Sequence, residues 1–304
     1  MPEQPAVAPQ RPFPQVGDLE VEHRFITVGD LRLHVALCGP PAAEPLLLLH
    51  GWPQHWFMWR KVLPELARGR RCIVPDLRGL GWSDAPSLGY RKEQLADDVL
   101  GILDALEVER TDLIAHDWGG WVGFLLALRA PERLGRYLAL NIPPPWPTQR
   151  GRLRALGAAW RLWYQVVIAT PGLGIALVGR QRVMARVLRA DNVHATTFSD
   201  EDLAVFTAAL ADSQRAAASS RYYREFLMHE LPGALAGRYA GVPLTVPTHI
   251  LFGTGDRAIA RSLIDGAQRP GDPLTVEFVA DSGHFVAEER PDLVIQRARD
   301  FLGV

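Results

Sequence analysis

Apolar and polar positions along the first half of the chain fall into short blocks that predict strands alternating with helices. Two alternating runs, Leu19–Val28 and Leu31–Leu37, indicate a hairpin around Gly29 and Asp30, because these residue types favour tight turns. The wholly apolar run Leu46–Leu49 is typical of a strand that is buried on both faces. The same reasoning predicts further strands at Cys72–Val74, Asp112–Ile114 and Leu138–Leu140, and helices at Trp56–Ala67, Lys92–Leu106 and Trp121–Ala130.

The pattern changes at Pro143–Pro147, where closely spaced prolines end regular structure. A helical pattern with no convincing strand runs from Trp146 to about Ala240, and strands then resume at 247–252 and Leu274–Val279, before a last helix at Pro291–Leu302. This order predicts a mostly parallel sheet covered on both sides, with a helical cap over the carboxyl ends of its strands. The expected divisions are a flexible, Pro-rich lead-in at 1–17, a core in two parts at 18–145 and 241–304, and the cap at 146–240.

One apolar stretch, residues 157–179, is long enough to suggest a membrane span. Arg161 and Gln165 interrupt it, and Pro171 followed by Gly172 would break a helix near its middle. We therefore interpret the stretch as two cap helices with apolar faces. No transmembrane segment is expected, and a peripheral contact of the cap with a membrane stays open.

Composition narrows the classes of function. A chain of 304 residues with 48% hydrophobic content can bury a large core. Its formal net charge of −1 leaves no excess of basic residues for nucleic-acid binding. Cys38 and Cys72 are the two cysteines, and since neither they nor the histidines have metal-ligand spacing, we expect no metal and no cofactor. A reducing, cytoplasmic location fits this cysteine usage, and the choice between monomer and homodimer stays open.

The candidate chemistry centres on Asp117, in the run His-Asp-Trp-Gly-Gly. A predicted strand ends just before it and a predicted helix follows, and the small residues Ala115 and Gly119 permit the sharp turn called a nucleophile elbow. With an unperturbed pKa of about 3.9, an aspartate is ionised at neutral pH and needs no base to activate it. Attack by the carboxylate on saturated carbon makes an alkyl ester, which predicts a substrate with a leaving group there, such as an epoxide oxygen or a halide.

Two further residues complete a candidate catalytic set. Asp256 follows one predicted strand and His284 follows the next, which gives the chain order nucleophile, acid, histidine. His284 would take a proton from the water that cleaves the ester, while Asp256 orients the imidazole. The backbone N–H groups of Trp52, in His-Gly-Trp-Pro, and of Trp118 are expected to form an oxyanion hole for the tetrahedral intermediate.

These motifs together resemble the epoxide hydrolases of the α/β-hydrolase fold. The resemblance extends from about Phe25 onward and rests on the motif around Asp117, on His-Gly-Trp-Pro, on Asp76–Asp84 and on Gly-His-Phe-Val-Ala-Glu-Glu-Arg-Pro. It implies an α/β-hydrolase fold, with a mostly parallel eight-stranded sheet flanked by helices and a helical cap inserted after the sixth strand. The Asp76–Asp84 segment is interpreted as a structural loop without a catalytic role.

The resemblance also implies that two cap tyrosines donate hydrogen bonds to the epoxide oxygen. Such donors matter because an alkoxide is a poor leaving group unless it is protonated or strongly hydrogen-bonded. Tyr164 resembles the first tyrosine and Tyr223 the second, with Tyr222 as a direct competitor of Tyr223. Trp118, Trp163 and Phe285 are expected to line the substrate pocket, whereas His50 and His116 are assigned structural roles.

The expected function is therefore hydrolysis of a lipophilic epoxide to a vicinal diol, with water as co-substrate and an alkyl-enzyme ester on Asp117. The nearest alternative is a haloalkane dehalogenase that uses the same nucleophile. Trp52 replaces the asparagine that some of these enzymes use to hold halide, although Trp163 could supply a second indole donor. Asn141 occupies the place where some dehalogenases carry their acid, so Asp256 must serve here. A serine esterase is excluded because the elbow carries no serine.

Overall fold

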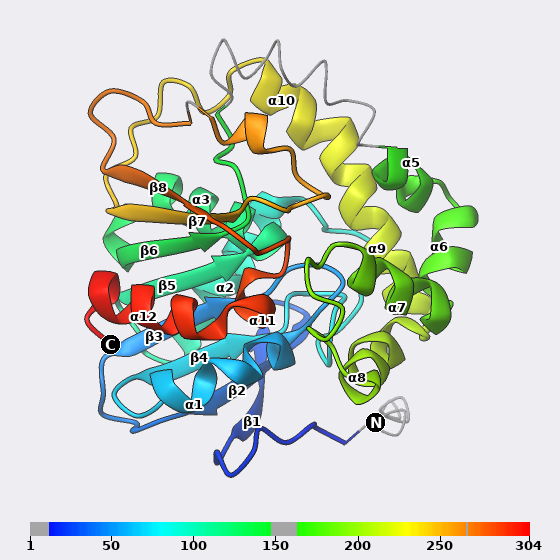
Figure 1. Cartoon of the computed structure of the whole chain (residues 1–304), viewed down its shortest axis with the longest axis horizontal. Coiled ribbons are helices and arrows are strands. Elements are labelled where there is room, and N and C mark those ends of the chain that lie inside the picture. The colour runs from blue at the N-terminus through cyan, green and yellow to red at the C-terminus, as the bar shows by residue number, and fades with distance from the viewer. Residues whose placement is uncertain (1–11, 147–162, 266) are drawn as a thin grey trace.

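The computed structural model describes residues 12–146, 163–265 and 267–304. Its strands form a sheet in the order β1-β2-β4-β3-β5-β6-β7-β8 (Figure 1). They are β1 (Glu22–Val28), β2 (Leu31–Cys38), β3 (Pro45–Leu49), β4 (Arg71–Pro75), β5 (Thr111–His116), β6 (Leu134–Leu140), β7 (Thr248–Gly253) and β8 (Leu274–Val279). β2 pairs antiparallel with β1 and β4, whereas β3 to β8 are all parallel to one another. The predicted mostly parallel, eight-stranded sheet is confirmed.

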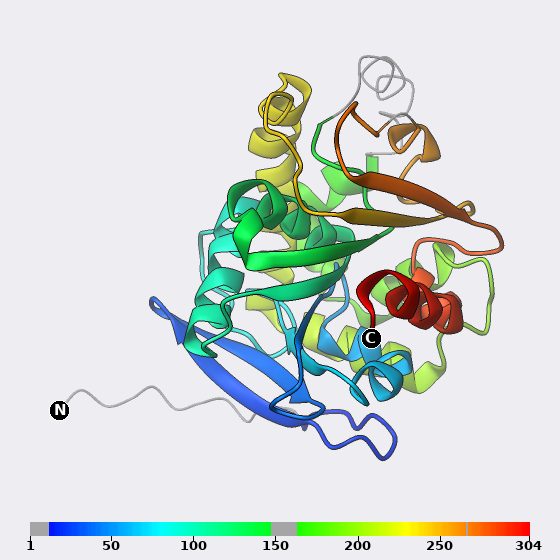
Figure 2. The same cartoon turned by 90° about the vertical axis from the view of Figure 1, so that its left-hand side faces the viewer.

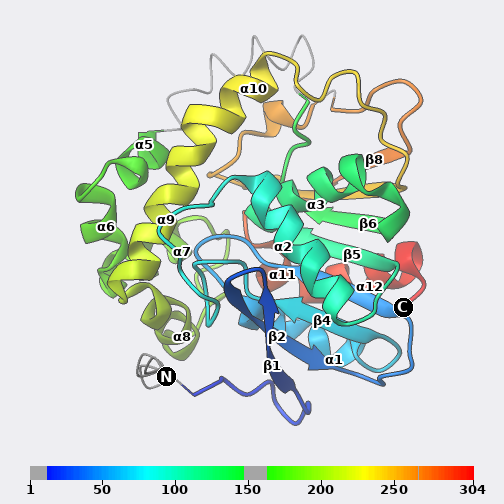
Figure 3. The ribbon, with the colours of Figure 1, turned by 180° about the vertical axis from the view of Figure 1, so that it is seen from behind.

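The buried strands send alternate side chains into two separate cores. On β3, Leu47 and Leu49 join one core, whereas Leu46 and Leu48 join the other. Full burial of each such leucine contributes about 1.5–3 kcal/mol. Figure 3 shows α2 (Lys92–Ala105) and α3 (Asp117–Arg129) covering one face of the sheet. The other face packs against η1 (Trp56–Lys61), α1 (Leu63–Leu66), α11 (Val286–Glu289) and α12 (Pro291–Leu302).

Helices dominate the described residues between β6 and β7, and we refer to these helices as the cap. They are α5 (Trp163–Ala169), α6 (Leu173–Val178), α7 (Gln181–Ala190), α8 (Asp200–Leu210), α9 (Ser213–Glu225), the π-helical turn η4 (Phe226–Glu230) and α10 (Leu231–Leu235). α5 and α6 pack against α9, which η4 and α10 continue, and the group lies beside the sheet in Figure 1. Figure 2 shows the β1–β2 hairpin at one edge of the sheet and β8 at the opposite edge. The short helices η2 (Pro131–Arg133) and η5 (Arg261–Leu263) complete the elements within the described residues.

The apolar stretch at 157–179 divides as the prolines and glycines predict, as far as the structure describes it. α5 ends at Ala169 and α6 begins at Leu173, and Gly172 between them has a φ of 77°. Residues 157–162 lie outside the described residues. Within the described ranges, no helix is both long and apolar enough to cross a bilayer.

Two helices differ from their predicted limits. α3 begins at Asp117 itself rather than at Trp121, because the elbow turns within a single residue and helical geometry follows at once. The helix expected at Trp56–Ala67 is divided into η1 and α1. Pro64 lies in the first turn of α1, where its missing N–H does no harm, so the division comes just before it.

The N-terminal segment is packed where the structure describes it. The flexible lead-in was expected to reach residue 17, yet the Phe13 ring stacks on His23 with centroids 3.7 Å apart, and Val16 is buried. The Leu19 N–H donates to the Val16 carbonyl oxygen at 3.0 Å, which forms a turn and delays the start of β1 to Glu22. Residues 1–11 lie outside the described residues.

Candidate active site

The centre of the site is the turn between β5 and α3. Asp117 has a φ of 49°, a left-handed conformation that non-glycine residues adopt at a cost of about 1–3 kcal/mol and that clusters at functional sites. Close approach of two backbones requires Gly119, since a Cβ there would lie 2.4 Å from the His50 carbonyl oxygen. The turn therefore holds the Asp117 carboxyl at the carboxyl end of the central strand β5, as the elbow motif predicts.

Backbone N–H groups of the loop after β3 and of the first turn of α3 bind the Asp117 carboxylate. The Trp52 N–H donates to Asp117 Oδ2 at 2.9 Å, and the Trp118 N–H also donates to this carboxylate. Burial raises the pKa of Asp117 above its usual range, whereas the His284 imidazolium and these two N–H groups oppose that rise. The carboxyl is therefore not in the unperturbed state that the sequence suggested, and the N–H groups stabilise its ionised form.

His284 lies between two carboxylates. Its Nδ1 is 2.9 Å from Asp256 Oδ2, and its Nε2 is 3.9 Å from Asp117 Oδ1, which is too long for a direct hydrogen bond. Burial alone would lower the pKa of His284, but Asp256 and Asp117 outweigh it and raise the pKa to about 9. The Asn141 amide donates to Asp256 Oδ2 at 2.8 Å and to the Gly283 carbonyl at 3.1 Å, which fixes the orientation of the acid.

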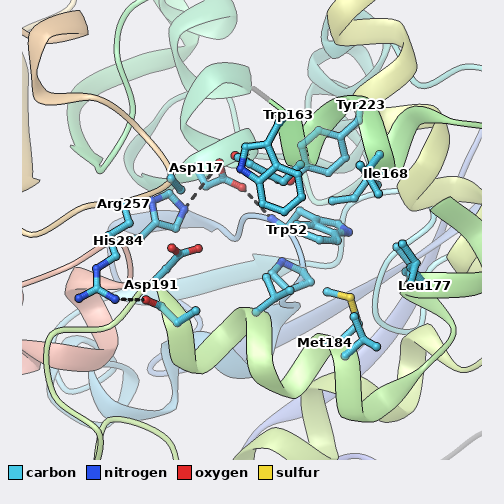
Figure 4. A pocket seen from close by; sticks show the side chains of 18 of the residues that line it. Trp52, Asp117, Trp163, Ile168, Leu177, Met184, Asp191, Tyr223, Arg257 and His284 are labelled. Atoms are coloured by element: carbon cyan, nitrogen blue, oxygen red, sulfur yellow. Dashed lines mark hydrogen bonds and ion pairs between the residues drawn. The ribbon is translucent and has the colours of Figure 1, made fainter. Parts of the chain in front are cut away.

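The two candidate tyrosines reach the site from separate cap helices. Tyr164 on α5 and Tyr223 on α9 line the same cavity as Asp117, and their ring centroids are 6.1 Å apart. Figure 4 shows the Tyr223 ring beside Trp52, whose centroid is 5.0 Å away. Burial raises the pKa of both tyrosines, which keeps each phenol protonated as a hydrogen-bond donor.

Tyr222 points elsewhere. Its hydroxyl donates to the Arg78 carbonyl at 2.8 Å in the core, and its ring packs on Tyr90. Neighbouring residues on a helix differ by about 100° in direction, so Tyr222 and Tyr223 cannot both face the cavity. The geometry selects Tyr223 over Tyr222 as the second tyrosine at the site.

Asp117 lies between two cavities. The larger, of about 530 Å³, is lined by Trp52, Tyr164, Tyr223, His284, Trp163 and Phe285 together with aliphatic side chains of α5, α6 and α7. The smaller, of about 140 Å³, shares Asp117, Tyr164 and Tyr223 and is lined further by Trp118, Trp121 and Phe226. Of the three residues expected to line the pocket, Trp163 and Phe285 thus line the larger cavity and Trp118 the smaller one.

Two buried histidines and the Asp76–Asp84 loop support the backbone around the site. The His50 ring links the Gly51 carbonyl to the Leu77 N–H, both at 3.0 Å, which supports the loop that carries Trp52. The His116 Nε2 bonds the His284 carbonyl at 2.8 Å. The buried Asp76 carboxylate accepts from the backbone N–H groups of Trp56 and Trp82 at 2.7 and 2.9 Å. These hydrogen bonds hold backbone segments in place, which is a structural role.

The described residues include no cluster of three or more His, Cys, Asp or Glu side chains that would hold a metal ion.

Asp191 is a pocket residue that the sequence patterns do not predict. Asp191, at the C-terminal end of α7, lines the larger cavity beside His284. It follows an Arg- and Ala-rich helix and lies in no motif, so its sequence context offers no signal of this position.

Comparisons with known proteins agree with this architecture. A profile of the α/β hydrolase fold family matches residues 44–291. The chain is similar to the soluble epoxide hydrolase of Corynebacterium sp. (strain C12), with 29% identity over 93% of this chain and 97% of that protein. It is also similar to epoxide hydrolase 3 of Xenopus tropicalis, with 28% identity over 92% of this chain and 78% of that protein.

A solved structure shows the same likeness. The epoxide hydrolase of Vigna radiata superposes with a TM-score of 0.78 and 27% identity, and the match covers 93% of this chain and 98% of that one. The family profile spans most of the sequence, including the strand that precedes the elbow, the cap and the histidine loop. This chain therefore belongs to the α/β hydrolase fold family.

Proposed function

We propose that this protein is an epoxide hydrolase that opens a lipophilic epoxide to a vicinal diol through a covalent ester on Asp117. The observation that carries the proposal is a carboxylate and two phenol donors lining one largely aliphatic cavity. A carboxylate attacks carbon, and phenols protonate or hydrogen-bond an oxygen that leaves it. The epoxide hydrolases of Corynebacterium and Vigna radiata, similar over nearly the whole chain, support the same reaction.

Ring opening begins at the free oxygen of Asp117. The Trp52 N–H occupies Oδ2, which leaves Oδ1 to attack an epoxide carbon as the carbon–oxygen bond of the ring breaks. Tyr164 and Tyr223 donate hydrogen bonds to the departing oxygen, and one of them transfers its proton to it. The product is a hydroxyalkyl ester of Asp117. Because the ester is neutral, it also removes one of the negative charges that hold the proton on His284. That proton then returns to the deprotonated tyrosine, which restores the phenol and leaves the imidazole neutral.

Hydrolysis of the ester then uses His284 and the backbone N–H groups of Trp52 and Trp118. The 3.9 Å gap between His284 Nε2 and Asp117 leaves room for a water to bridge them, and the imidazole takes a proton from that water. The hydroxide attacks the ester carbonyl carbon, and the negative charge develops on Oδ2, to which the Trp52 N–H donates, with the Trp118 N–H donating to the same carboxyl group. Collapse of the intermediate breaks the ester bond, and the proton on His284 passes to the leaving alkoxide. The proton that remains on the Asp117 carboxyl then returns to His284, and the diol departs. Removal of one such donor typically costs about 2.7–4 kcal/mol.

A haloalkane dehalogenase would use the same nucleophile and histidine. Halide is a stable anion that needs no proton to leave, whereas an alkoxide does. Two protonated phenols in the cavity therefore favour an epoxide as substrate.

The test is an assay of the purified protein on aryl and alkyl epoxides and on haloalkanes, with diol and halide measured in parallel. We expect diol without halide release, and turnover in ¹⁸O-labelled water should place the heavy oxygen in the peptide that contains Asp117. Asp117→Asn should abolish turnover and the labelling. Halide release without diol formation would contradict the proposal.

The tyrosines offer a matched control on one helix. Tyr164→Phe combined with Tyr223→Phe should lower the rate of ester formation by about 10²- to 10⁴-fold, the usual contribution of general acids. Tyr222→Phe removes a hydroxyl that faces the core, so its loss should cost stability and leave ester formation unaffected. Equal effects of Tyr222→Phe and Tyr223→Phe would argue against the proposed proton donor.

A further inference from the structure

The larger cavity is chemically asymmetric. Aliphatic side chains line the part that faces the cap, among them Ile168, Leu177 and Met184. Asp191 and Arg257 line the part near His284. Figure 4 shows the aliphatic side chains on one side of the cavity and the two charged residues on the other. An epoxide bound at Asp117 would therefore have aliphatic side chains on one side and charged side chains on the other.

The backbone of Asp191 is fixed by contacts where the cap meets the core. It caps the C-terminus of α7, and its carbonyl oxygen accepts the His284 N–H at 3.0 Å. The fit requires glycine at position 283, since a Cβ there would lie 2.3 Å from that same carbonyl oxygen. The backbone of Asp191 thus has one position relative to the catalytic histidine, and its side chain points into the cavity in Figure 4.

The Asp191 carboxylate has no bonding partner of its own. Within the described ranges it accepts no hydrogen bond and forms no ion pair, although it is partly buried. Arg257, which lines the same part of the cavity, instead donates to the Ala190 carbonyl at 3.0 Å. An unsatisfied carboxylate in a largely aliphatic cavity is unfavourable, and such groups in native proteins usually meet a ligand or serve chemistry.

A direct part in the proposed reaction does not explain this carboxylate. Both ring nitrogens of His284 already face other acids, Asp256 at 2.9 Å and Asp117 at 3.9 Å. The groups that act on Asp191 are these same residues and Arg257. Burial raises the pKa of Asp191, Asp256 and Asp117 raise it further, and His284 and Arg257 lower it. The carboxylates outnumber the cations in this group, which favours a ligand that donates hydrogen bonds over an anion.

We propose that Asp191 determines specificity, by accepting a hydrogen bond from an epoxide whose substituent carries a hydroxyl group or another donor. The inference rests on the proposed epoxide hydrolase function and narrows its substrate class to amphiphilic epoxides. The donor group lies toward Asp191, and the hydrocarbon part lies against Ile168, Leu177 and Met184.

The experiment compares a series of epoxy alcohols of increasing chain length with the epoxyalkanes in which a methyl group replaces the hydroxyl. At the best chain length, the wild type should prefer the alcohol by about tenfold or more in kcat/KM, the range of a hydrogen bond to a charged group. Asp191→Asn keeps one acceptor and should reduce the preference. Asp191→Leu should reverse it, because the epoxyalkane then meets an apolar wall and gains in kcat/KM.

The matched control is Asp30→Asn, which neutralises an exposed carboxylate in the turn between β1 and β2 and should leave the ratio unchanged. Damage to the fold would lower kcat/KM for both substrates, so only a change of the ratio supports the inference. An equal ratio in the wild type, Asp191→Asn and Asp191→Leu would overturn the role of Asp191 alone. Failure of the wild type to open any epoxide would overturn the proposed function and, with it, this inference.

Discussion

At the scale of single residues, Asn141 supports Asp256, the proposed orienting acid. Asn141 follows β6 with a φ of 47°, a left-handed conformation that asparagine and aspartate tolerate better than other side chains. Its amide nitrogen lies 2.8 Å from Asp256 Oδ2, the oxygen that also faces His284. A carboxylate at position 141 would therefore lie close to the imidazole Nδ1 without a change of backbone.

This geometry predicts that the orienting acid can be moved. Asp256→Ala should lower kcat on the order of 10⁴-fold, as loss of the orienting acid does in comparable triads. Adding Asn141→Asp should raise kcat more than tenfold above that of Asp256→Ala, because a carboxylate again stabilises the imidazolium. The measurement is single-turnover hydrolysis of the ester intermediate, with Asp256→Ala plus Asn141→Leu as the control. Equal rates in the two double variants would disprove the relocation.

At the scale of elements, a buried ion pair joins the core helix α2 to the cap. The Lys92 ammonium bonds Glu230 Oε2 and the Tyr222 carbonyl, both at 3.0 Å, and lies 4.5 Å from the centre of the Trp118 ring. The Lys92 N–H donates to Glu230 Oε1 at 2.6 Å. Glu230 ends the π-helical turn η4, so the pair fixes the end of the helix that carries Tyr223 against the nucleophile elbow.

Breaking this pair on one side should destabilise the protein strongly. Lys92→Met leaves the Glu230 carboxylate buried and unpaired, which costs about 3–5 kcal/mol. The double variant Lys92→Met, Glu230→Gln removes both charges and keeps an acceptor for the Lys92 N–H, so it should recover much of that loss. Urea unfolding of the wild type, both single variants and the double variant measures the coupling. Additive losses would mean that the pair contributes no coupling.

At the scale of the whole molecule, the site couples stability to pH. The folded-state pKa of His284 is about 9, above the ordinary value of 6.5, so the folded protein binds this proton more tightly than the unfolded chain does. The resulting stabilisation is fully present below pH 6.5 and is lost as pH rises through 9. A shift of this size corresponds to about 3 kcal/mol.

The free energy of unfolding should therefore fall between neutral pH and pH 9, and a series of urea unfolding curves across this range measures the slope. His284→Gln removes the titrating group and should flatten the curve over the same range. A slope that is identical in the wild type and in His284→Gln would show that other groups control the alkaline loss of stability.

Much of the fold followed from local patterns. The apolar runs of β3 and β6 predict strands buried on both faces, and the proline-rich segment after β6 marks where the sheet is interrupted. The limits of elements were less predictable. The turn at Val16 and Leu19 and the division of the helix at Pro64 depend on individual backbone hydrogen bonds, which periodicity does not record.

Some features of the candidate site were likewise predictable from the sequence, and others were not. The sequence by itself predicted that Asp117, Asp256 and His284 lie together, because each follows a strand and parallel strands bring their carboxyl ends to one edge. Only the tertiary structure decided which of two adjacent tyrosines enters the cavity and that Asp191 joins it. Both depend on how the cap packs on the core, through contacts such as the pair of Lys92 and Glu230, 138 residues apart in sequence. The altered pKa of Asp117 has the same origin, since burial and neighbouring charges exist only once the chain has folded.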